Sequence, residues 1–521
     1  MRLAVAACAL ALFAIAANTL ARPLRGSAPY TVILCQFTGS PATTITNTLA
    51  RNFFSAPGTV SLHQYFNDVS RGELRFDDVD VLGWFTAPMT VAQARALPRT
   101  QLVQICTSAA ATAGRTVPPG RRLAVVTNPG IQTTGSSGWV LLGVEMLDSD
   151  FSGATHETGH SLGFAHSYAD RDDPPAPPAT SYIEYYDAFD IMSHNLTFRT
   201  MPGPRGETGP GMNAYNLERS GWLGRSELAT HGGDGRTDVT YTLKPLYGPG
   251  TGGVRAVRVP IDIADLFHYY SIELRQNTGW DAVTASSWVS IHEIKRFPDQ
   301  PNGGYRSFFL RQNTYGDAVQ HLNANGVRID VLSIAPGGAS AQVRVIGGIG
   351  NSCLAGFVKR VAGPGDRVCT TPAGAAAAAA DNLDPHGEAD DPRRWRCLRG
   401  YVPRRAYQGD AVCVTAPRRE QIVQENALAA SRINYARFFI GPNACAPGYV
   451  WREADDRDFV CVVGATRAET RRQYVFMKRE TCPLGLVPRM ATPTDRACTS
   501  PAAAARAAAD NADAVNRYAV P

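Results

Sequence analysis

The spacing of the cysteines constrains this chain more than any other feature of its sequence. Eight of the 11 cysteines fall in four pairs, with fifteen residues between the members of each pair: Cys353/Cys369, Cys397/Cys413, Cys445/Cys461 and Cys482/Cys498. Neighbours within a pair are expected to form disulfides, and Cys35 is then expected to pair with Cys106. With Cys8 set aside the number is even, as an oxidising compartment permits. A zinc ribbon would need C-x-x-C spacing, which the sequence lacks.

The four cysteine pairs mark a fourfold repeat. Every copy reads Cys-x-x-Gly-(aromatic or Leu)-Val, with a basic residue two or three positions further on and an Asp two or three before the second Cys. Alanine- and arginine-rich stretches of helical character follow most copies. Each copy is too small for a core of its own, and a disulfide that closes such a loop stabilises it by roughly 3 kcal/mol. Residues 351–521 are therefore predicted to form four small disulfide-stapled modules.

The first residues have the layout of a cleaved secretory signal. The basic start Met1-Arg2 precedes an apolar run of about fifteen residues and a small-residue exit at Thr19-Leu20-Ala21. We expect residues 1–21 to be removed; an uncleaved N-terminal anchor is the alternative. No later stretch is long and apolar enough to span a bilayer, so the protein is predicted to be secreted and extracellular, without a transmembrane segment.

At 521 residues, the chain is longer than a single hydrophobic core usually supports, so more than one domain is expected. Hydrophobic residues make up 44% and charged residues 19%, an ordinary balance for a folded soluble protein. Residues 28–232 mix β-rich runs, such as Tyr30–Cys35 and 138–146, with helix-forming stretches such as 91–113, which predicts an α+β domain. Short alternating runs separated by glycine-rich turns over residues 233–348 predict an all-β, sandwich-like domain.

The net charge of +5 is unevenly placed. Residues 351–521 hold 24 Lys+Arg against 18 Asp+Glu, a balance of +6. A mildly basic region favours acidic polysaccharide, cell wall or anionic membrane as a partner. A solvated surface with an arginine excess explains the same balance. No basic run is dense enough to indicate nucleic-acid binding.

The segment from His156 to His166 reads His-Glu-Thr-Gly-His-Ser-Leu-Gly-Phe-Ala-His. Residues four apart on a helix share a face, so His156 and His160 can reach one cation. Gly163 can end that helix in a left-handed turn, which would return the chain and bring in His166 as the third ligand. Imidazole nitrogens in this pattern suit Zn²⁺.

Three protein ligands leave the fourth zinc position for water, whose pKa the metal lowers to about 7. Glu157 lies about 100° round the helix from His156 and can take the proton of that water without ligating the metal. The same carboxyl group can then pass the proton to the leaving amine. One catalytic zinc ion is therefore predicted. Acidic turns at Asp148–Asp150 and Asp170–Asp173 can hold calcium, but such turns are usually only solvated, so no calcium site is claimed.

The pattern H-E-x-x-H-x-x-G-x-x-H is similar to the zinc motif of the metzincin metallopeptidases at every fixed position. Further segments resemble the gametolysin and immune-inhibitor-A group, namely Tyr65–Phe76, Val81–Phe85, Tyr186–Met192 and Met212–Leu223. The resemblance covers about residues 28–345. It implies an α+β metzincin catalytic domain with a β-rich segment behind it, and endopeptidase action on extracellular or wall proteins.

Metzincins also carry a methionine in a tight turn beneath the zinc, and the resemblance gives Met192 this structural role. Several members place a tyrosine two residues later, where its hydroxyl can assist the transition state. Here that position is His194. A histidine there can donate a hydrogen bond to the oxyanion, or it can be an exposed loop residue; the sequence leaves both open.

The predicted function is that of a secreted zinc endopeptidase acting on protein or peptide substrates. A secreted adhesion or binding protein with a non-catalytic metzincin shell is one alternative, and a zinc hydrolase of a non-peptide substrate is another. The repeats suit multivalent attachment to cell-wall or acidic polysaccharide, or a protease-resistant spacer. Cutting the chain after about Gly348 is expected to leave hydrolysis of small peptides intact.

Overall fold

The structure, a computed structural model, describes residues 24–170, 182–184, 187–196, 200–203, 205–233, 236–250, 252–261, 265, 267–282, 286–296, 304–314, 321–348, 353–354, 356–363, 366, 368–389, 395–407, 409–432, 442–476 and 481–518. The expected signal segment, residues 1–21, lies outside these ranges. The chain forms two compact units: residues up to 165 with 201–208 and 477–517, and residues 166–200 with 209–476 and 518–521. Within the described ranges, no helix combines the length and apolar character that crossing a membrane requires.

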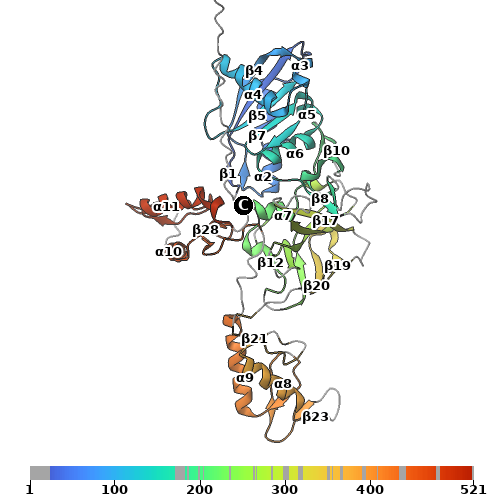
Figure 1. Cartoon of the computed structure of the whole chain (residues 1–521), viewed down its shortest axis with the longest axis vertical. Coiled ribbons are helices and arrows are strands. Elements are labelled where there is room, and N and C mark those ends of the chain that lie inside the picture. The colour runs from blue at the N-terminus through green and yellow to red at the C-terminus, as the bar shows by residue number, and fades with distance from the viewer. Residues whose placement is uncertain are drawn as a thin grey trace, which may run out of the picture. The chain divides into compact units, whose positions relative to one another are not determined.

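A five-stranded sheet organises the first unit, with its strands in the order β4-β2-β5-β7-β6. Strands β4, β5 and β7 of this sheet are labelled in Figure 1. Neighbouring strands are parallel except β6, which runs antiparallel to β7. The interior strand β2 is apolar and buried along most of its length, as a strand covered on both faces must be. The bounds are β2 Tyr30–Thr38, β4 Val79–Thr90, β5 Arg122–Asn128, β6 Thr134–Ser136 and β7 Trp139–Gly143, with the short pairs β1 Gly26–Ser27/β3 Leu74–Arg75 and β10 Thr200–Gly203/β11 Gly206–Thr208.

Helices cover both faces of this sheet. On one face, Leu102 of α4 packs in a core with Ile33 of β2 and Leu141 of β7. On the other, the Tyr30 ring contacts Phe54 of α1, and its hydroxyl is hydrogen-bonded to a residue of α6. The helices are α1 Asn47–Ser55, α2 Leu62–Val69, α3 Val91–Arg95, α4 Arg99–Thr112, α5 Val144–Asp148 and α6 Phe151–Ser161. The expected mixture of strands and helices is therefore present.

One predicted strand is too long. The apolar run over 138–146 suggested a single strand, but β7 ends at Gly143 and the helix α5 begins at Val144. Gly143 has an extended backbone (φ −93°, ψ 154°) and serves as the N-cap of that helix. Val140 to Leu142 are buried in the strand, and Met146 is buried in the helix that follows. Both parts of the run are therefore apolar, and its composition does not mark where the strand ends.

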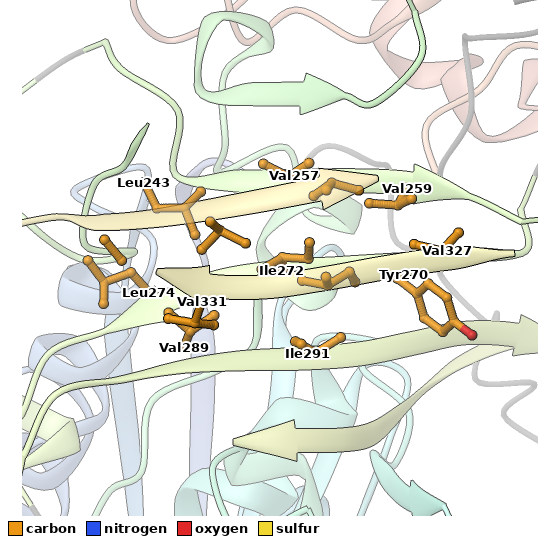
Figure 2. Close-up of a cluster of buried hydrophobic side chains, with 14 residues drawn as sticks. Leu243, Val257, Val259, Tyr270, Ile272, Leu274, Val289, Ile291, Val327 and Val331 are labelled. Carbon is orange, nitrogen blue, oxygen red and sulfur yellow. The ribbon is translucent and has the colours of Figure 1, made fainter. Parts of the chain in front are cut away.

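Two sheets pack around one apolar core in the second unit (Figure 2). The seven-stranded sheet has the order β12-β14-β15-β16-β17-β8-β9, and the four-stranded sheet the order β13-β20-β19-β18. Their strands are β8 Tyr168–Asp170, β9 Tyr182–Glu184, β12 Leu228–Thr230, β13 Asp238–Leu243, β14 Ala256–Pro260, β15 Tyr269–Arg275, β16 Trp288–Arg296, β17 Tyr305–Thr314, β18 His321–Ala324, β19 Val327–Ile334 and β20 Ala341–Gly347. The core is supplied by both sheets, for example by Ile272 and Ile291 of the first and Val331 and Val343 of the second. Strand β8 begins shortly after His166, and β8 and β9 lie at one end of the seven-stranded sheet.

Each Cys-x15-Cys repeat is a two-stranded hairpin followed by a helix. All four predicted disulfides are present, as is Cys35–Cys106, which joins β2 to α4. The hairpins are β21 Val358–Lys359/β22 Cys369–Thr370, β25 Val402–Pro403/β26 Cys413–Val414, β27 Val450–Trp451/β28 Cys461–Val462 and β29 Val487–Pro488/β30 Cys498–Thr499, and the helices are α8 Pro372–Leu383, α9 Ala416–Leu428, α10 Gly464–Phe476 and α11 Pro501–Ala512. A further pair, β23 Gly387–Ala389/β24 Trp395–Cys397, precedes the second hairpin.

The basic and acidic residues of the repeat signature form a buried ion pair. In every copy an arginine Nε donates to the carboxylate of the aspartate six residues later, at 2.7 to 2.9 Å: Arg360–Asp366, Arg404–Asp410, Arg452–Asp458 and Arg489–Asp495. The same carboxylate accepts backbone N–H groups within its own hairpin, such as Ala406 and Val412 on Asp410. These arginines are buried structural residues, which makes them unavailable for binding an external polyanion.

The first two repeats, including α8 and α9, contact each other reciprocally. Arg360 Nη2 donates to the carbonyl of Ala406, and Arg404 Nη2 donates to the carbonyl of Ala362, both at 2.9 Å. Arg360 also pairs with Glu425 of α9 at 3.0 Å. A small shared core holds the pair together, consisting of Ala362, Ala378, Ala406 and Ile422. One repeat therefore completes the other.

Removing the Arg404 guanidinium group should destabilise the contact between the first two repeats. In Arg404→Met the buried Asp410 carboxylate loses its partner, which costs about 3–5 kcal/mol when one half of a buried ion pair is removed. Hydrogen exchange in peptides covering residues 397–428 should report an opening free energy lower by that amount. Arg399→Met, at an exposed position of the same repeat, should change it little. Equal protection in both variants would show that the ion pair is dispensable.

Candidate metal site

The helix α6 carries two of the three predicted ligands and is almost wholly buried. Its N-cap is Asp150, whose carboxylate accepts from the backbone N–H of Gly153 at 2.9 Å. Inside the helix, the hydroxyls of Thr155 and Thr158 donate to backbone carbonyls one turn earlier, so these polar side chains can be buried. The Ser161 hydroxyl is hydrogen-bonded to Tyr30 of β2. The helix is therefore fixed to the sheet at its C-terminal end.

The turn expected at Gly163 is present. Gly163 has φ +87°, the left-handed region that glycine adopts without strain. Its N–H donates to the carbonyl of His160 at 2.9 Å, and the N–H of Phe164 donates to the carbonyl of Gly159 at 3.1 Å. This is the Schellman pattern that ends a helix, and it turns the chain toward His166.

The three predicted histidines come together. One ring nitrogen of each of His156, His160 and His166 lies within 4.8 Å of the others, and this group can hold a metal ion. The Nε2 atoms of His156 and His160 are 3.1 Å apart. Nitrogens bound tetrahedrally to zinc at about 2.0–2.1 Å would be about 3.3 Å apart, so the spacing of this pair is compatible with such an ion. His156 is buried, and the other two are half-buried.

A backbone contact fixes the orientation of one ligand. His160 Nδ1 lies 2.8 Å from the carbonyl oxygen of Phe164. A carbonyl only accepts, so Nδ1 must carry the proton and Nε2 keeps its lone pair for the metal. Such outer partners set the tautomer and the ring orientation of histidine ligands. The turn at Gly163 therefore both returns the chain and orients His160.

Met192 contacts the chain segment that carries His166, the third predicted ligand. It is fully buried in the 3-10 helix Ile191–Leu196. Its carbonyl accepts from the N–H of Ser167, the residue after His166, at 3.1 Å. The side chain of His194, the candidate oxyanion donor, is outside the part of the chain whose side chains the structure describes. Its proposed role stays a prediction.

A buried carboxylate next to Met192 was not predicted from the sequence. Asp190 accepts from the N–H of Met192 at 2.7 Å, from the N–H of Asn213 at 2.9 Å and from the Asn216 side chain at 3.0 Å. Burial raises the pKa of Asp190 to about 7, and the nearby Asp187 carboxylate adds to this rise. The chain just before Met192 is thereby tied to the segment around Asn213.

Asp187 is in turn paired with His292 of β16, with Oδ2 and Nε2 3.0 Å apart and both side chains buried. Burial alone would lower the pKa of His292, but the Asp187 carboxylate outweighs it and the pKa is raised. Further buried charges complete the network: Arg275 pairs with Glu273 and Asp281. No sequence motif marks these residues, because they come from β15, β16 and loops far apart in the chain.

The edge strand β6 lies close against α6. A Cβ added to Gly135 would come within 1.9 Å of the Glu157 carbonyl oxygen and 2.6 Å of His160 Cβ. Only a residue without a side chain allows this approach, because backbone atoms cannot shift as easily as the end of a flexible side chain. Gly135 is therefore a site residue that the sequence did not reveal; a glycine in a short polar run gives no signal of its own.

Whether the two acidic turns could hold calcium can be assessed in part. Among the described residues, the histidine group is the one set of His, Cys, Asp and Glu side chains found close enough to hold a metal. The Asp150 carboxylate serves as the N-cap of α6. Residues 171–173 of the second acidic turn lie outside the described residues.

Comparison with protein-family models finds no match. Comparison with curated proteins also finds none. The function must therefore be inferred from the side chains themselves.

Substituting Gly135 tests the contact between β6 and α6. Gly135→Val should displace the helix at Glu157 and His160, and so weaken metal binding by about tenfold or more, as changes next to metal ligands do. Isothermal titration with zinc measures this. Ser136→Val, at the adjacent exposed position, should leave the affinity within about twofold. Unchanged affinity in Gly135→Val would mean that β6 does not constrain the ligands.

The Asp190 network predicts a pH dependence. An acid whose pKa is higher in the folded chain binds its proton more tightly when folded. The stabilisation is complete below about pH 4 and is lost as the pH rises through about 7. The raised pKa of His292 acts in the same direction. In Asp190→Asn, the decline of the thermal midpoint between about pH 5 and about pH 9 should be shallower.

Asp238→Asn is the control for this experiment. Asp238 is exposed, and a hydrogen bond from Arg344 lowers its pKa, so removing its carboxylate cannot flatten a loss that occurs as the pH rises. A decline as steep in Asp190→Asn as in the unmodified protein would exclude Asp190 as its source.

Proposed function

We propose that this chain is a secreted zinc-dependent endopeptidase of the metzincin type, closest to the gametolysin and immune-inhibitor-A group. The observation that supports this most directly is the convergence of three histidine nitrogens within 4.8 Å, two of them from one helix that also carries Glu157. Three neutral imidazoles are a donor set of hydrolytic zinc sites, and the carboxylate of Glu157 directly follows His156 on the same helix without belonging to that set. The exact match to H-E-x-x-H-x-x-G-x-x-H adds to it.

When bound, a zinc ion would supply Lewis acidity that lowers the pKa of water to about 7 and polarises a carbonyl. The chain supplies the rest. His156, His160 and His166 would hold the ion. Glu157 is half-buried on the same helix and would accept the proton of the attacking water, then deliver it to the leaving nitrogen.

A peptide substrate is favoured over other substrates by the sheet edge beside the site. Among the described strands, β6 ends the order of the five-stranded sheet, so one of its sides has no strand paired with it. Gly135 in this strand lies against His160. An extended peptide can add to such an edge through main-chain hydrogen bonds, which would bring its carbonyl groups near the histidines. This is also why endopeptidase action is proposed in place of hydrolysis of a small non-peptide substrate.

The role of Glu157 is testable with a nearly isosteric change. Glu157→Gln should bind zinc as tightly as the unmodified protein, because the carboxylate is not a ligand, and casein hydrolysis should fall by at least about a thousandfold. Metal analysis and a fluorescent casein assay measure the two quantities. Retained turnover above a few per cent would exclude Glu157 as the proton carrier. An unmodified protein that binds zinc but cleaves no peptide would support a binding protein.

The three-histidine ligand set predicts that zinc binding and hydrolysis are lost together. His156→Ala, His160→Ala and His166→Ala should each lower zinc content and casein hydrolysis together, since a three-ligand site has none to spare. His63→Ala, outside this group, is the matched control and should retain both. Stoichiometric zinc with unchanged affinity in His166→Ala would mean that another residue completes the site.

A further inference from the structure

The third repeat differs from the other three at the tip of its hairpin. The three residues before the paired aspartate are Gly-Pro-Gly in the first copy, Tyr-Gln-Gly in the second and Thr-Pro-Thr in the fourth, but Asp455-Asp456-Arg457 in the third. Three consecutive charged residues replace neutral ones. The internal disulfide and the Arg452–Asp458 pair need none of these charges, because the other copies form the same hairpin without them.

These residues bind the segment 224–227, which lies directly before strand β12. The guanidinium group of Arg225 donates to the carbonyl of Asp455 at 2.8 Å and to that of Asp458 at 3.1 Å, and its backbone N–H donates to the carbonyl of Asp456 at 3.0 Å. Arg225 also lies over the Phe459 ring, 5.8 Å from its centroid. One arginine thus binds three carbonyls of the tip.

The charged side chains of the tip make further contacts with the same segment. The Asp456 carboxylate accepts from the backbone N–H of Ser226 at 3.1 Å and from its hydroxyl at 2.7 Å. The Arg457 guanidinium lies 3.6 Å from the buried Glu227 carboxylate. A Cβ on Gly224 would meet Asp456 at 2.0 Å, so the two surfaces touch directly. The tip residues particular to this repeat are those that make the contacts.

A second contact lies at the helix α7 (Ala214–Arg219). The side chain of Asn443, just before the third repeat, donates to the carbonyl of Glu218 at 2.5 Å. The Glu218 carboxylate is buried and paired with Arg258 of β14 at 2.9 Å. The third repeat therefore holds the C-terminal end of α7 as well as residues 224–227.

The other end of α7 contacts the segments that carry Met192 and Ser167, the residue after His166. Its N-cap is Asn213, whose backbone N–H donates to the Asp190 carboxylate and whose side chain donates to Ser307 at 2.8 Å. Ser307 in turn donates to the hydroxyl of Ser167, the residue after His166, at 3.2 Å. The six-residue helix spans only about 9 Å. Every step of this path lies in one compact unit.

We propose that the third repeat is a docking module that holds α7 in place and thereby positions His166 and the Met192 turn. Residues 455–458 and Asn443 are positioning residues and do not contact the metal. The inference rests on the proposed function only in taking His166 as a metal ligand. It replaces the expectation that a chain cut after Gly348 keeps full hydrolysis, because that cut removes the contacts that the third repeat and Asn443 make with Arg225, Ser226 and Glu218.

The test uses the full chain with zinc, and with Co²⁺ as a spectroscopic probe of ligand geometry. Asp456→Ala and Arg225→Ala should each weaken zinc binding by about tenfold, the lower end of what outer partners of metal ligands contribute. Both should alter the visible absorption of bound Co²⁺. The double variant should lose little more than either single one, because the two residues share one contact. Glu420→Ala, at an exposed acidic position of α9, is the matched control.

A second substitution at Asp456 distinguishes docking from a general loss of folding. Asp456→Asn keeps an acceptor for Ser226 and should restore most of the affinity, which a nonspecific loss of folding would not allow. Affinity and Co²⁺ spectra equal to those of the control in Asp456→Ala and Arg225→Ala would overturn the proposal. If the unmodified protein binds zinc but cleaves no casein, the proposed function fails while the affinities still decide the docking role.

Discussion

The Asp190 carboxylate is the interaction on which the candidate site most depends. It accepts hydrogen bonds from the backbone of Met192 and of Asn213 and from the Asn216 side chain, so one buried group fixes two chain segments that lie about twenty residues apart. A carboxylate in such a place has lost its hydration, and the backbone N–H groups replace the water it has lost. If these donors moved, the buried oxygen atoms would be left unsatisfied, which is costly. The Met192 turn and the start of α7 are therefore held as one structure.

The repeats use a buried charge for a different purpose. A buried arginine with its aspartate is a poor source of net stability, because desolvation offsets much of the attraction. The geometry of the arginine matters more here than the energy of the ion pair, because the planar guanidinium group has five N–H donors in fixed directions. Arg360 uses them on Asp366 within its own hairpin and on Ala406 and Glu425 of the neighbour. In the first two repeats, each hairpin is thus tied to its own tip and to the other repeat through a single side chain.

The sequence was most informative where a local pattern sets the structure. The disulfides follow from even spacing, and the convergence of His156 with His160 follows from the period of a helix. The left-handed turn at Gly163 could be predicted because few residues other than glycine adopt it. The signature arginine and aspartate of the repeats were visible as a pattern, but their burial was not, because charged residues are usually exposed.

The parts that could not be predicted depend on contacts between distant segments. His292 and Asp187 are 105 residues apart, and Arg225 and Asp455 are 230 apart. No periodicity or motif links such positions, since the fold alone brings them together. The same reason explains Gly135: its closeness to His160 comes from the packing of β6 on α6, and the residue itself carries no chemistry.

The reciprocal contact between the first two repeats bears on how such an array can change over evolutionary time. Arg360 needs the carbonyl of Ala406, and Arg404 needs that of Ala362. Losing one of the two copies would leave the guanidinium group of the survivor with its own aspartate but without the carbonyl acceptor that the other copy supplies, and would expose the small core of alanines and Ile422. Gaining or losing both together would leave nothing unsatisfied. For these two repeats, the unit that can be gained or lost without such gaps is therefore the pair.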